Sequence, residues 1–585
     1  MMKKWSYSIW GVFAILVITL FVFLQQEYAY HFFFIEQNYM FQSSLAYAES
    51  KFILPGGFIE WTGEFLMQFF MYPYVGATIT VVLLVLIALL TNGILQKINK
   101  GYDWLIASAV PSLFLLFMHF DFNYMLAGTV AFLFMLAVFR VAILIKHAGW
   151  RLIYHCISVC LLYWLCGSVF TLYIVLTVLF EFLSKSSLRY WSLVLIPFGG
   201  LLGFLSLSLA LQGEYRFVFL PDMFYHNNLS AKTHIYFSWI VLVVLFIFAF
   251  IFKPQQEKKN WRRIVELLTS FILVLLLFGW GVGQHGDQKA KQVKKLDYFV
   301  RAEQWDNIIK ESDGLLTNYL YLCYLNMALA EKGELAERMF LYDQRGIEGL
   351  MLKWNRTFSI SVMLSDVYFV IGNVAIAQEM AFEAYISSMG GGNPRMLKRL
   401  IQTNLIYGEY KVAGKYIDLL EQTLYYKDWA KEQRRFLYND EAVESDPLLG
   451  EKRRGLVDNS YLSNTQGFAQ DLISLAEHYP ANKNAIEYLG ASLLLTKDMQ
   501  GFKSLLETYY GTDILPELPL GFQEAVIILF ENTPDEWEKY SVSMPVIDRF
   551  TGYKRAILAN KHSQSLPQLM ARDFANTYWF YFMFK

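Results

Sequence analysis

The chain has 585 residues, of which 55% are apolar and only 17% charged, and its mean hydropathy is +0.32. A soluble chain of this length is less apolar, so a large part of this one must lie in lipid. The formal net charge is −1 and no Lys/Arg-rich tail is present, which argues against a nucleic-acid partner.

Apolar segments suited to the membrane, whose hydrocarbon core is about 30 Å thick, fill the chain as far as residue 283, and none follows. The pattern predicts about nine spans in a membrane domain of residues 1–285. The segment around Cys166-Gly167-Ser168 holds either two short spans or one bent span, and we adopt two. The predicted spans are residues 7–24, 74–95, 103–119, 122–145, 152–165, 167–183, 190–211, 235–252 and 264–283.

Basic residues alternate between the predicted connections, and Lys and Arg near short loops remain on the cytoplasmic side of a membrane. Every second connection is basic, whereas the intervening ones carry only Lys51, Arg216 and Lys232. We therefore predict a bacterial cytoplasmic-membrane protein with an uncleaved N-terminal anchor, a cytoplasmic N-terminus and an extracytoplasmic second half. The residues assigned to the cytoplasmic side are Lys3, Lys4, Lys97, Lys100, Lys146, Arg151, Lys185, Arg189, Lys253, Lys258, Lys259, Arg262 and Arg263.

The second half, residues 286–585, is predicted to consist of helices joined by short turns. It resembles a degenerate tetratricopeptide array, and a plain stack of helical hairpins is the alternative. Either arrangement predicts a concave surface that holds a peptide or protein segment. A charged connector, residues 438–447 and 451–454, is predicted to be a loop that acts as a spacer. The best match to the repeat is Gly408, Tyr410, Ala413 and Tyr416, and weaker matches start at Gly333, Gly372 and Lys497.

The first outside loop, residues 25–73, is long, and loops of that length usually have a function. Its acidic residues outnumber its single base, Lys51. After Pro55-Gly56-Gly57 we predict a helix that lies in the membrane interface. Its apolar face is formed by Phe58, Trp61, Phe65 and Phe69, and its polar face by Glu60, Glu64 and Gln68.

A cytoplasmic Lys-Lys pair, one span, an early outside carboxylate, an interfacial helix and then serial spans together resemble the polytopic glycosyltransferases that use lipid-linked sugars. The resemblance implies that Glu36, in Phe34-Ile35-Glu36-Gln37-Asn38, acts as a base toward the acceptor or binds a divalent metal. That family has two adjacent carboxylates here, whereas this chain has Glu36-Gln37. The resemblance also implies a second carboxylate at the next outside turn, where Asp121 lies.

Further candidates for substrate binding lie in two outside loops. Glu60 and Glu64 belong to the first. In the loop from Gln212 to His234, cationic and histidine side chains are suited to the diphosphate of a polyprenyl donor, although a solvated surface role is an alternative for Arg216. For Glu181 and His155, a helix–helix hydrogen bond and a polar pathway are both considered. The candidates in the second loop are Arg216, Asp222, His226 and His234.

Three functions compete. The first is a lipid-dependent glycosyltransferase or ligase whose helical half captures a protein acceptor, a layout that also resembles the O-mannosyltransferases with tetratricopeptide repeats. The second is a non-enzymatic, membrane-anchored scaffold for an envelope assembly. The third is a transporter or channel, against which the few charges within the spans argue. As a whole the chain is similar to bacterial multi-pass proteins with this two-part layout, a similarity that implies no activity.

The alternation of basic loops predicts that residues 290–585 lie outside the cytoplasm. A phosphatase fused after Lys585 should therefore be active, and a fluorescent protein that folds only in the cytoplasm should stay dark at the same position. The opposite pattern would overturn the predicted topology.

Overall fold

The computed structural model describes residues 2–100, 102, 104–252, 260–314, 316, 318–457 and 467–585, so Lys253, Lys258 and Lys259 lie outside the described residues. The described residues form helices and no β-strand, which confirms the predicted all-α class. They divide into two compact units, the first Met1–Lys291 with Gln422–Tyr425 and the second Gln292–Glu421 with Tyr426–Lys585.

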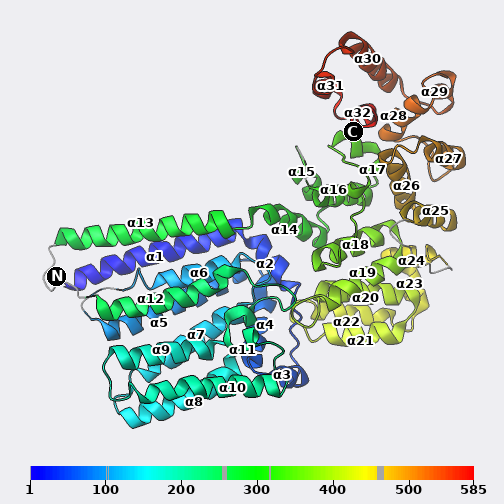
Figure 1. Ribbon diagram of the computed structural model, residues 1–585. Coiled ribbons are helices and arrows are strands. Elements are labelled where there is room, and N and C mark those ends of the chain that lie inside the picture. The colour runs from blue at the N-terminus through cyan, green and yellow to red at the C-terminus, as the bar shows by residue number, and fades with distance from the viewer. Residues whose placement is uncertain are drawn as a thin grey trace. The chain divides into compact units, whose positions relative to one another are not determined.

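The first unit has an apolar helix at each of the nine predicted spans, and Figure 1 shows these helices side by side. In the described part of the chain, six are long and apolar enough to cross a membrane. They are α1 (Met2–Glu27), α5 (Val75–Ile98), α8 (Ala148–Cys166), η2 with α10 (Trp191–Val194 and Leu195–Ser208), η4 with α12 (Thr233–Tyr236 and Phe237–Ile251) and α13 (Asn260–His285). The shorter three are α6 (Ala109–His119), α7 (Leu126–Ala142) and α9 (Val169–Leu183).

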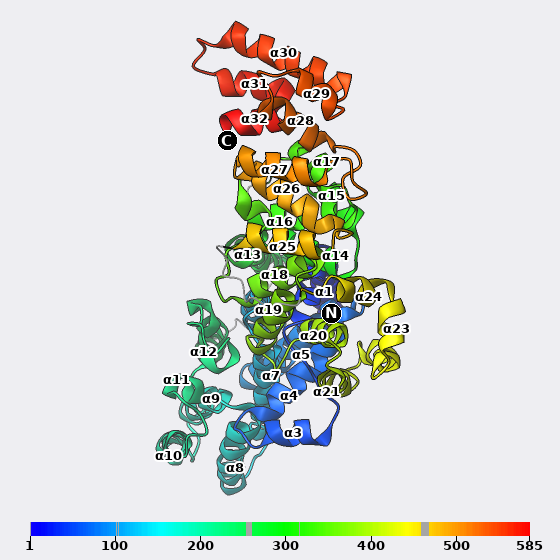
Figure 2. The same cartoon turned by 90° about the vertical axis from the view of Figure 1, so that its right-hand side faces the viewer.

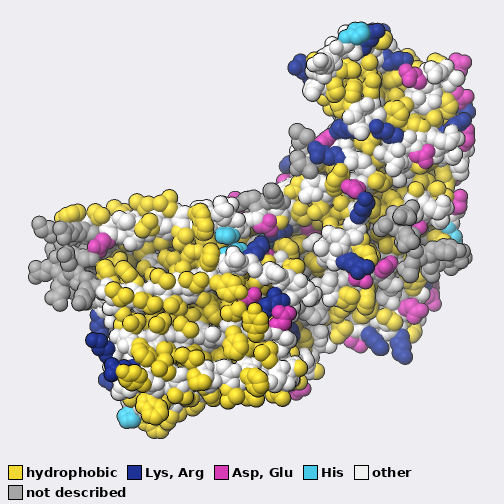
Figure 3. Space-filling view, viewed as in Figure 1, with side chains coloured by type: hydrophobic (Ala, Val, Ile, Leu, Met, Phe, Trp, Pro, Cys, Tyr) yellow, Lys and Arg dark blue, Asp and Glu magenta, His cyan; other side chains and the backbone are white. Residues whose placement is uncertain are grey.

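Apolar side chains cover the flank of this unit in Figure 3, as expected for a surface that faces lipid. They include Leu161, Val244 and Leu276, each more than half exposed. Soluble proteins rarely expose an apolar surface of this extent to water, so the exposed side chains support the membrane assignment of these helices.

Gly167 separates α8 from α9, so the uncertain apolar segment forms two helices. Its φ is +64°, a conformation that glycine adopts without steric strain. A Cβ at this position would also lie 2.2 Å from Sδ of Met223. Across the helix pair, Arg151 forms a bidentate ion pair with the buried Glu181 (2.7 and 3.0 Å). Nδ1 of His155 hydrogen-bonds the Tyr173 hydroxyl (2.8 Å), so these residues link helices.

The helix α6 begins six residues later than its predicted span, at Ala109 instead of 103. Trp104 and Leu105 precede it in a non-helical segment and are each 1% exposed. Pro111 lies in the first turn of α6, where its missing N–H removes no hydrogen bond. The irregular backbone is therefore enclosed by protein, as irregular segments must be at membrane depth.

The loop of residues 25–73 is folded into helices that pack on the apolar ones. The predicted interfacial helix corresponds to α4. This helix packs against α7 and α8 and also contacts α3. Glu64 is 1% exposed, so its assignment to a solvent face was wrong. At Gly63 an added Cβ would lie 2.9 Å from the Ala127 nitrogen, which shows how closely α4 approaches α7. The loop contains α2 (Ala29–Glu36), α3 (Leu45–Phe52), α4 (Gly57–Met67) and η1 (Gln68–Met71).

The second unit contains helical hairpins at all four predicted turns. Gly333, Gly372, Gly408 and Lys497 each adopt a positive φ between helices. Hairpins are thereby confirmed, while membership of the tetratricopeptide class stays a prediction. The helices involved are α16 (Tyr319–Glu331), α17 (Leu335–Arg338), α18 (Phe358–Ile371), α19 (Val374–Ile386), α20 (Pro394–Tyr407), α21 (Tyr410–Leu420), α26 (Lys483–Leu495) and α27 (Met499–Tyr509).

The helix α18 is enclosed, because every residue from 361 to 371 is buried. Its neighbours are α16, α19 and α26, and Figure 2 shows α25 to α27 lying over α16 and α18. In a linear repeat array each hairpin contacts only its neighbours in sequence. The return of α26 to α16 and α18 therefore departs from a linear array, while the concave binding surface stays a prediction.

The charged connector is helical, so its prediction as a loop was wrong. Asp446 accepts hydrogen bonds from the N–H groups of Leu448 and Leu449 and thus caps a helix that starts with Pro447. Lys452 donates to the carbonyl of Val370 (3.2 Å), and Arg453 donates to the carbonyls of Leu405 (2.9 Å) and Ile406 (3.0 Å). These cations satisfy the last carbonyls of α18 and α20, a structural role that a spacer lacks. The connector forms α23 (Asp440–Ser445) and α24 (Pro447–Arg454).

The remaining helices are shorter or lie at the ends of the two units. In the first unit they are α11 (Tyr215–Phe219) and η3 (Pro221–Phe224). In the second they are α14 (Gln288–Arg301), α15 (Trp305–Glu311), η5 (Met339–Leu341), η6 (Ile347–Gly349), α22 (Lys427–Gln433), η7 (Arg434–Phe436), α25 (Phe468–His478), α28 (Leu520–Leu529), α29 (Asp535–Lys539), α30 (Met544–Asn560), α31 (Leu566–Phe574) and α32 (Tyr578–Phe584).

A buried ion network joins three helices of the second unit. Arg395 on α20 is 7% exposed and contacts Asp297 on α14 (2.7 Å) and Asp366 on α18 (2.6 Å). Arg399 also reaches Asp366 (3.0 Å). Each carboxylate depends on these guanidinium groups, because neither charge is solvated by bulk water.

Replacing Arg395 with Leu should destabilise the second unit by about 3–5 kcal/mol, because it removes the guanidinium group that contacts the buried Asp297 and one of the two that contact the buried Asp366. Arg434→Leu is the matched control: its ion pairs with Asp418 and Glu421 are 45% exposed on the Arg side and should be worth about 1 kcal/mol or less. Denaturant unfolding followed by circular dichroism measures both, and equal losses would contradict the network's role.

Candidate functional site

Asp121, between α6 and α7, is the centre of a polar cluster that we define as Asp121, Asn123, Tyr225, Lys232 and His234. Its carboxylate accepts hydrogen bonds from the Tyr225 hydroxyl (2.9 Å) and from the backbone and side chain of Asn123 (both 3.0 Å). Nζ of Lys232 lies 2.6 Å away. Burial by itself would raise the pKa of Asp121, but Lys232 and Asn123 outweigh it and lower that pKa. The side chain is thus an anion at neutral pH.

Two loops about a hundred residues apart are paired by backbone hydrogen bonds to form the polar cluster. Met125 N–H donates to the carbonyl of Phe224 (2.9 Å), and His226 N–H donates to that of Asn123 (3.1 Å). The pairing places Tyr225 against the Asp121 turn. Asp121 and the loop from Gln212 to His234, which the sequence offered as separate candidates, thus contact each other, and their role in a site stays a prediction.

His234 of the polar cluster lies against a second histidine, His285. The ring of His234 lies 4.2 Å from that of His285, at the end of α13. Nε2 of His234 is buried and has no hydrogen-bond partner among the described residues. Buried polar atoms are nearly always paired, so this nitrogen is suited to a hydrogen bond with a ligand or an ordered water.

The helix α2 runs beside the Asp121 turn and carries the predicted catalytic residue. Tyr28 stacks on Phe120 (4.4 Å), Nε2 of His31 lies 2.7 Å from the carbonyl of His119, and Phe34 packs edge-on against Phe122 (5.5 Å). Glu36 is the last residue of α2 and only 4% exposed. Glu36 therefore lies on a helix that contacts the Asp121 turn. It is at the C-terminal end of this helix, where the helix dipole does not favour an anion.

Besides Nε2 of His234, a second buried polar atom without a hydrogen-bond partner among the described residues belongs to Asn38, two residues after Glu36. It is 3% exposed, and its Nδ2 has no hydrogen-bond partner in the described part of the chain. A buried amide donor without a partner costs about 1–3 kcal/mol. Such a cost is typical of a site where a ligand supplies the missing acceptor.

The guanidinium group of Arg216 makes its contacts within its own loop: it forms an ion pair with Glu214 (2.6 Å) and lies over the ring of Phe217. The half-buried His226 accepts the Asn228 N–H at Nδ1 (3.2 Å). The buried Asp222 accepts the Tyr236 hydroxyl at 2.5 Å. Of the predicted phosphate contacts in this loop, His234 has a buried ring nitrogen, Nε2, without a hydrogen-bond partner among the described residues.

Glu60 and Glu64 are paired inside the first loop. Nζ of Lys51 lies 2.5 Å from Glu60 and 2.8 Å from Glu64, and the Tyr47 hydroxyl also donates to Glu64. One cation balances two carboxylates, so the more buried one is protonated more easily. Burial raises the pKa of Glu64 to about 7, with Lys51 opposing and Glu60 adding to the shift. These two residues link α4 to α3, and the substrate contact stays a prediction for them.

The divalent metal considered for this site has no donor set in the part of the chain that the structure describes. No three His, Cys, Asp or Glu side chains there are grouped so that they could hold a metal ion.

A family model described as "Family of unknown function (DUF6057)" matches residues 3–585. The chain belongs to this family. No curated protein and no solved structure matches the chain. The comparisons thus provide no support for the glycosyltransferase and tetratricopeptide resemblances, and the geometry must carry the functional argument.

Lys232, Tyr225 and His285 were not singled out as site residues from the sequence. Lys232 was noted only as one of three bases on the outside connections. Its contact with Asp121 depends on the pairing of the two loops, which leaves no local pattern in the sequence.

The raised pKa of Glu64 predicts a pH-dependent stability. The folded state favours the protonated form of Glu64, so this contribution to stability is complete below the ordinary glutamate pKa of 4.5 and is lost as the pH rises through about 7. The loss should be on the order of 3 kcal/mol, and Glu64→Gln should flatten the slope of thermal stability between pH 5 and 8. The exposed Glu49→Gln is the control and should keep the slope. A slope unchanged in Glu64→Gln would contradict the assignment.

Proposed function

We propose that the protein binds a lipid-linked phosphate at the polar cluster and transfers the sugar it carries to an acceptor. The observation that supports this is the ion pair of a buried carboxylate with an exposed cation. The side chain of Asp121 is 5% exposed, whereas that of its partner Lys232 is 57% exposed. A phosphate at the surface can therefore reach Lys232 without unfolding the site.

Competition for Lys232 would couple binding to chemistry. When a phosphate attracts the ammonium group, Asp121 loses its closest cation and becomes more basic. The carboxylate then accepts the proton of an acceptor hydroxyl, whose oxygen bonds to the sugar carbon. The bond from that carbon to the phosphate oxygen breaks, and its electron pair leaves on the phosphate, which Lys232 stabilises. Glu36, on the neighbouring α2, is the second carboxylate available to the acceptor.

The proposed topology has nine crossings, a cytoplasmic N-terminus and the second unit outside, in the bacterial cytoplasmic membrane. The apolar flank and the basic connections support it. The three shorter helices need not span the hydrocarbon alone, because α6 is preceded by a protein-enclosed segment at Trp104 and Leu105. In this topology the polar cluster faces the outer surface, where a lipid headgroup and an extracytoplasmic acceptor can meet.

A non-enzymatic scaffold for an envelope assembly is the second candidate. It is favoured by the internal ion pairs of Glu60, Glu64 and Arg216, which leave these side chains occupied in the protein itself. In this alternative the second unit binds a protein or peptide partner, and the polar cluster only holds the two loops together.

Asp121→Asn and Lys232→Met should separate the two candidates. For a transferase, removal of the base should lower the rate by about 10² to 10⁴-fold. Loss of Lys232 should mainly weaken donor binding. Rescue of a deletion phenotype, or transfer from a polyprenyl-linked sugar to an acceptor, measures both. Full rescue by both variants would favour the scaffold.

Glu36→Gln tests the second carboxylate in the same assays. If Glu36 is the base toward the acceptor, this variant should lose activity by a similar factor, about 10²-fold or more, while abundance and membrane insertion stay unchanged. The control is Glu49→Gln, in the same loop but exposed, which should remain active. An active Glu36→Gln would leave Asp121 as the single candidate base.

A further inference from the structure

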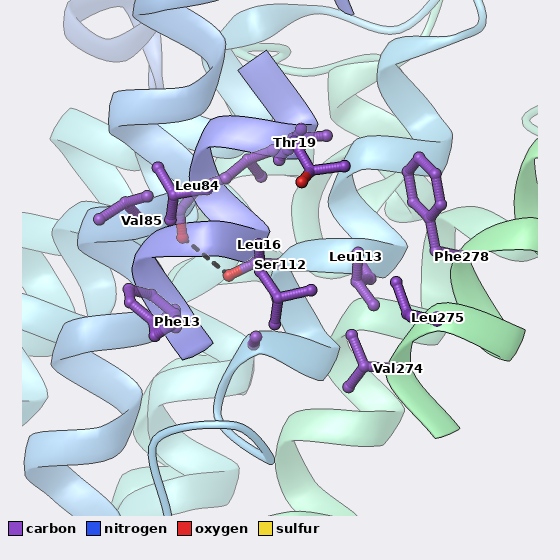
Figure 4. Close-up of a pocket in the computed structure, with 14 residues that line it drawn as sticks. Phe13, Leu16, Thr19, Leu84, Val85, Ser112, Leu113, Val274, Leu275 and Phe278 are labelled. Carbon is purple, nitrogen blue, oxygen red and sulfur yellow. Dashed lines mark hydrogen bonds between the residues drawn. The ribbon is translucent and has the colours of Figure 1, made fainter. Parts of the chain in front are cut away.

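Cavities of opposite chemistry occur in the two units. In the first unit, side chains of α1, α5, α6 and α13 converge on an apolar cavity of about 80 Å³ (Figure 4). Its described lining contains no charged side chain, and the hydroxyl of Ser112 is bonded to the carbonyl of Leu84 (2.9 Å). This cavity therefore offers no charge that would select a ligand.

The second unit has a larger cavity, of about 770 Å³, whose lining is charged and which we call the cationic cavity. Three segments that are far apart in the sequence form it: the segment after η5, the turn between α26 and α27, and the end of α32. The Tyr581 hydroxyl donates to the carbonyl of Leu495 (2.8 Å), which joins α32 to that turn. The lining includes Asp343, Arg345, Leu495, Lys497, Tyr581 and Lys585.

Positive charge exceeds negative charge in this lining, because three cations share one carboxylate. Arg345 donates from Nε (3.2 Å) and Nη2 (3.0 Å) to one oxygen of Asp343, and the ammonium group of Lys585 contacts the other. Lys497 forms no ion pair with the described residues, and its ammonium group lies 5.9 Å from the centre of the Tyr581 ring. An anion that enters the cavity therefore meets a cation whose charge is not already balanced.

The cations of the cavity can be reached from solvent. Lys497 is exposed at the turn between α26 and α27, where its φ is +58°. The adjacent acid, Asp498, does not belong to the lining and instead caps α27 by accepting the N–H of Gly501 (2.9 Å). The side chain of Arg345 is 35% exposed. A ligand can therefore contact both cations without unfolding the second unit.

The ion pair of Asp343 shows which kind of anion these cations accept. Arg345 binds that carboxylate through two N–H groups, a geometry that suits Asp and Glu side chains. The ring of Tyr581 and the side chain of Leu495 add apolar contact for the carbon groups of a ligand. Cavities of about 300–1,000 Å³ typically hold ligands much larger than an inorganic anion. A peptide with carboxylate side chains has all of these properties.

We propose that the cationic cavity binds an acidic peptide segment, whose Asp or Glu side chains pair with Lys497 and compete with Asp343 for Arg345 and Lys585. The proposal does not require sugar transfer, because every group involved belongs to the second unit. It gives the scaffold candidate a defined site and a partner of defined charge. Asp343 is then an internal competitor of the ligand, so its removal should strengthen binding.

The test uses the full-length protein in detergent and a fluorescein-labelled octapeptide of alternating Glu and Ala, whose binding is followed by fluorescence anisotropy. Lys497→Gln should weaken binding by about tenfold, because it removes a charge-assisted contact. Lys497→Arg keeps the charge and should bind nearly as the wild type does. The matched control is Lys503→Gln, which removes a cation of α27 that is paired with Glu507 (3.8 Å) and should leave the affinity unchanged.

Asp343→Asn tests the internal competition. It should raise the affinity by about threefold, because Arg345 and Lys585 lose their partner within the protein. A variant with a damaged fold would lose affinity, so a gain reports on the charge alone. The affinity of the wild type should also fall as NaCl rises from about 0.05 to about 0.5 M, because salt screens the attraction between exposed charges.

Competitors identify the class of ligand. The unlabelled octapeptide should displace the probe, whereas its counterpart of alternating Gln and Ala, inorganic phosphate and a single-stranded oligonucleotide should not do so at the same concentration. Equal displacement by any of these three would overturn the proposal. Equal losses in Lys497→Gln and Lys503→Gln, or a failure of Asp343→Asn to bind more tightly, would overturn it too.

The outcome is separable from that of the proposed function, because the two measurements report on different units. Binding of the octapeptide that depends on Lys497, without any sugar transfer, would retain the peptide site and remove the transferase. Sugar transfer that depends on Asp121, without binding of the octapeptide, would retain the transferase and remove the peptide site.

Discussion

The satisfaction of backbone hydrogen bonds away from water is the constraint on which the first unit depends. Hydrocarbon offers no partner to an exposed N–H or carbonyl group, so a segment that crosses it must be helical. Where the backbone departs from helix, at Trp104 and Leu105, other side chains enclose it. Where it reverses, at Gly167, the positive φ keeps the turn short and lets Met223 pack against it. The irregular backbone is thus confined to protected or terminal positions.

The same constraint explains which features the sequence could predict. Long apolar runs and tight turns are local, and they predicted the nine apolar helices and the four hairpins; three of these turns have Gly and the fourth has Lys497. The partners of charged residues are not local. Lys51 with Glu64 and Arg395 with Asp297 meet only after helices pack, so the assignment of Glu64 to a solvent face was wrong and the Arg395 network was not foreseen. The connector of residues 438–454 has the composition of a loop, yet Asp446 and Pro447 begin a helix there.

In the candidate site, too, local features could be predicted from the sequence and contacts between distant residues could not. Glu36 and Asp121 were selected by their distance from the predicted spans, and the structure places them on elements that contact each other. Lys232 acquires its role only through the pairing of the segments near Asn123 and Tyr225. The sequence could identify the segments that form the site, because apolar periodicity places them at one end of the helices. It could not identify which cation reaches which carboxylate, because that depends on backbone pairing between distant loops.

The capping of α18 has a consequence for the order in which the second unit is synthesised. The carbonyl of Val370 accepts hydrogen bonds from Lys452 and Asn484, and that of Ile371 accepts one from Asn482. These donors emerge from the ribosome 82 to 114 residues later than the carbonyl groups that they satisfy. Until then α18 also lacks its cover from α26, so its apolar faces remain open to other chains. A nascent second unit is therefore exposed to aggregation throughout this interval, and a holding chaperone would be most useful between the synthesis of residue 371 and that of residue 495.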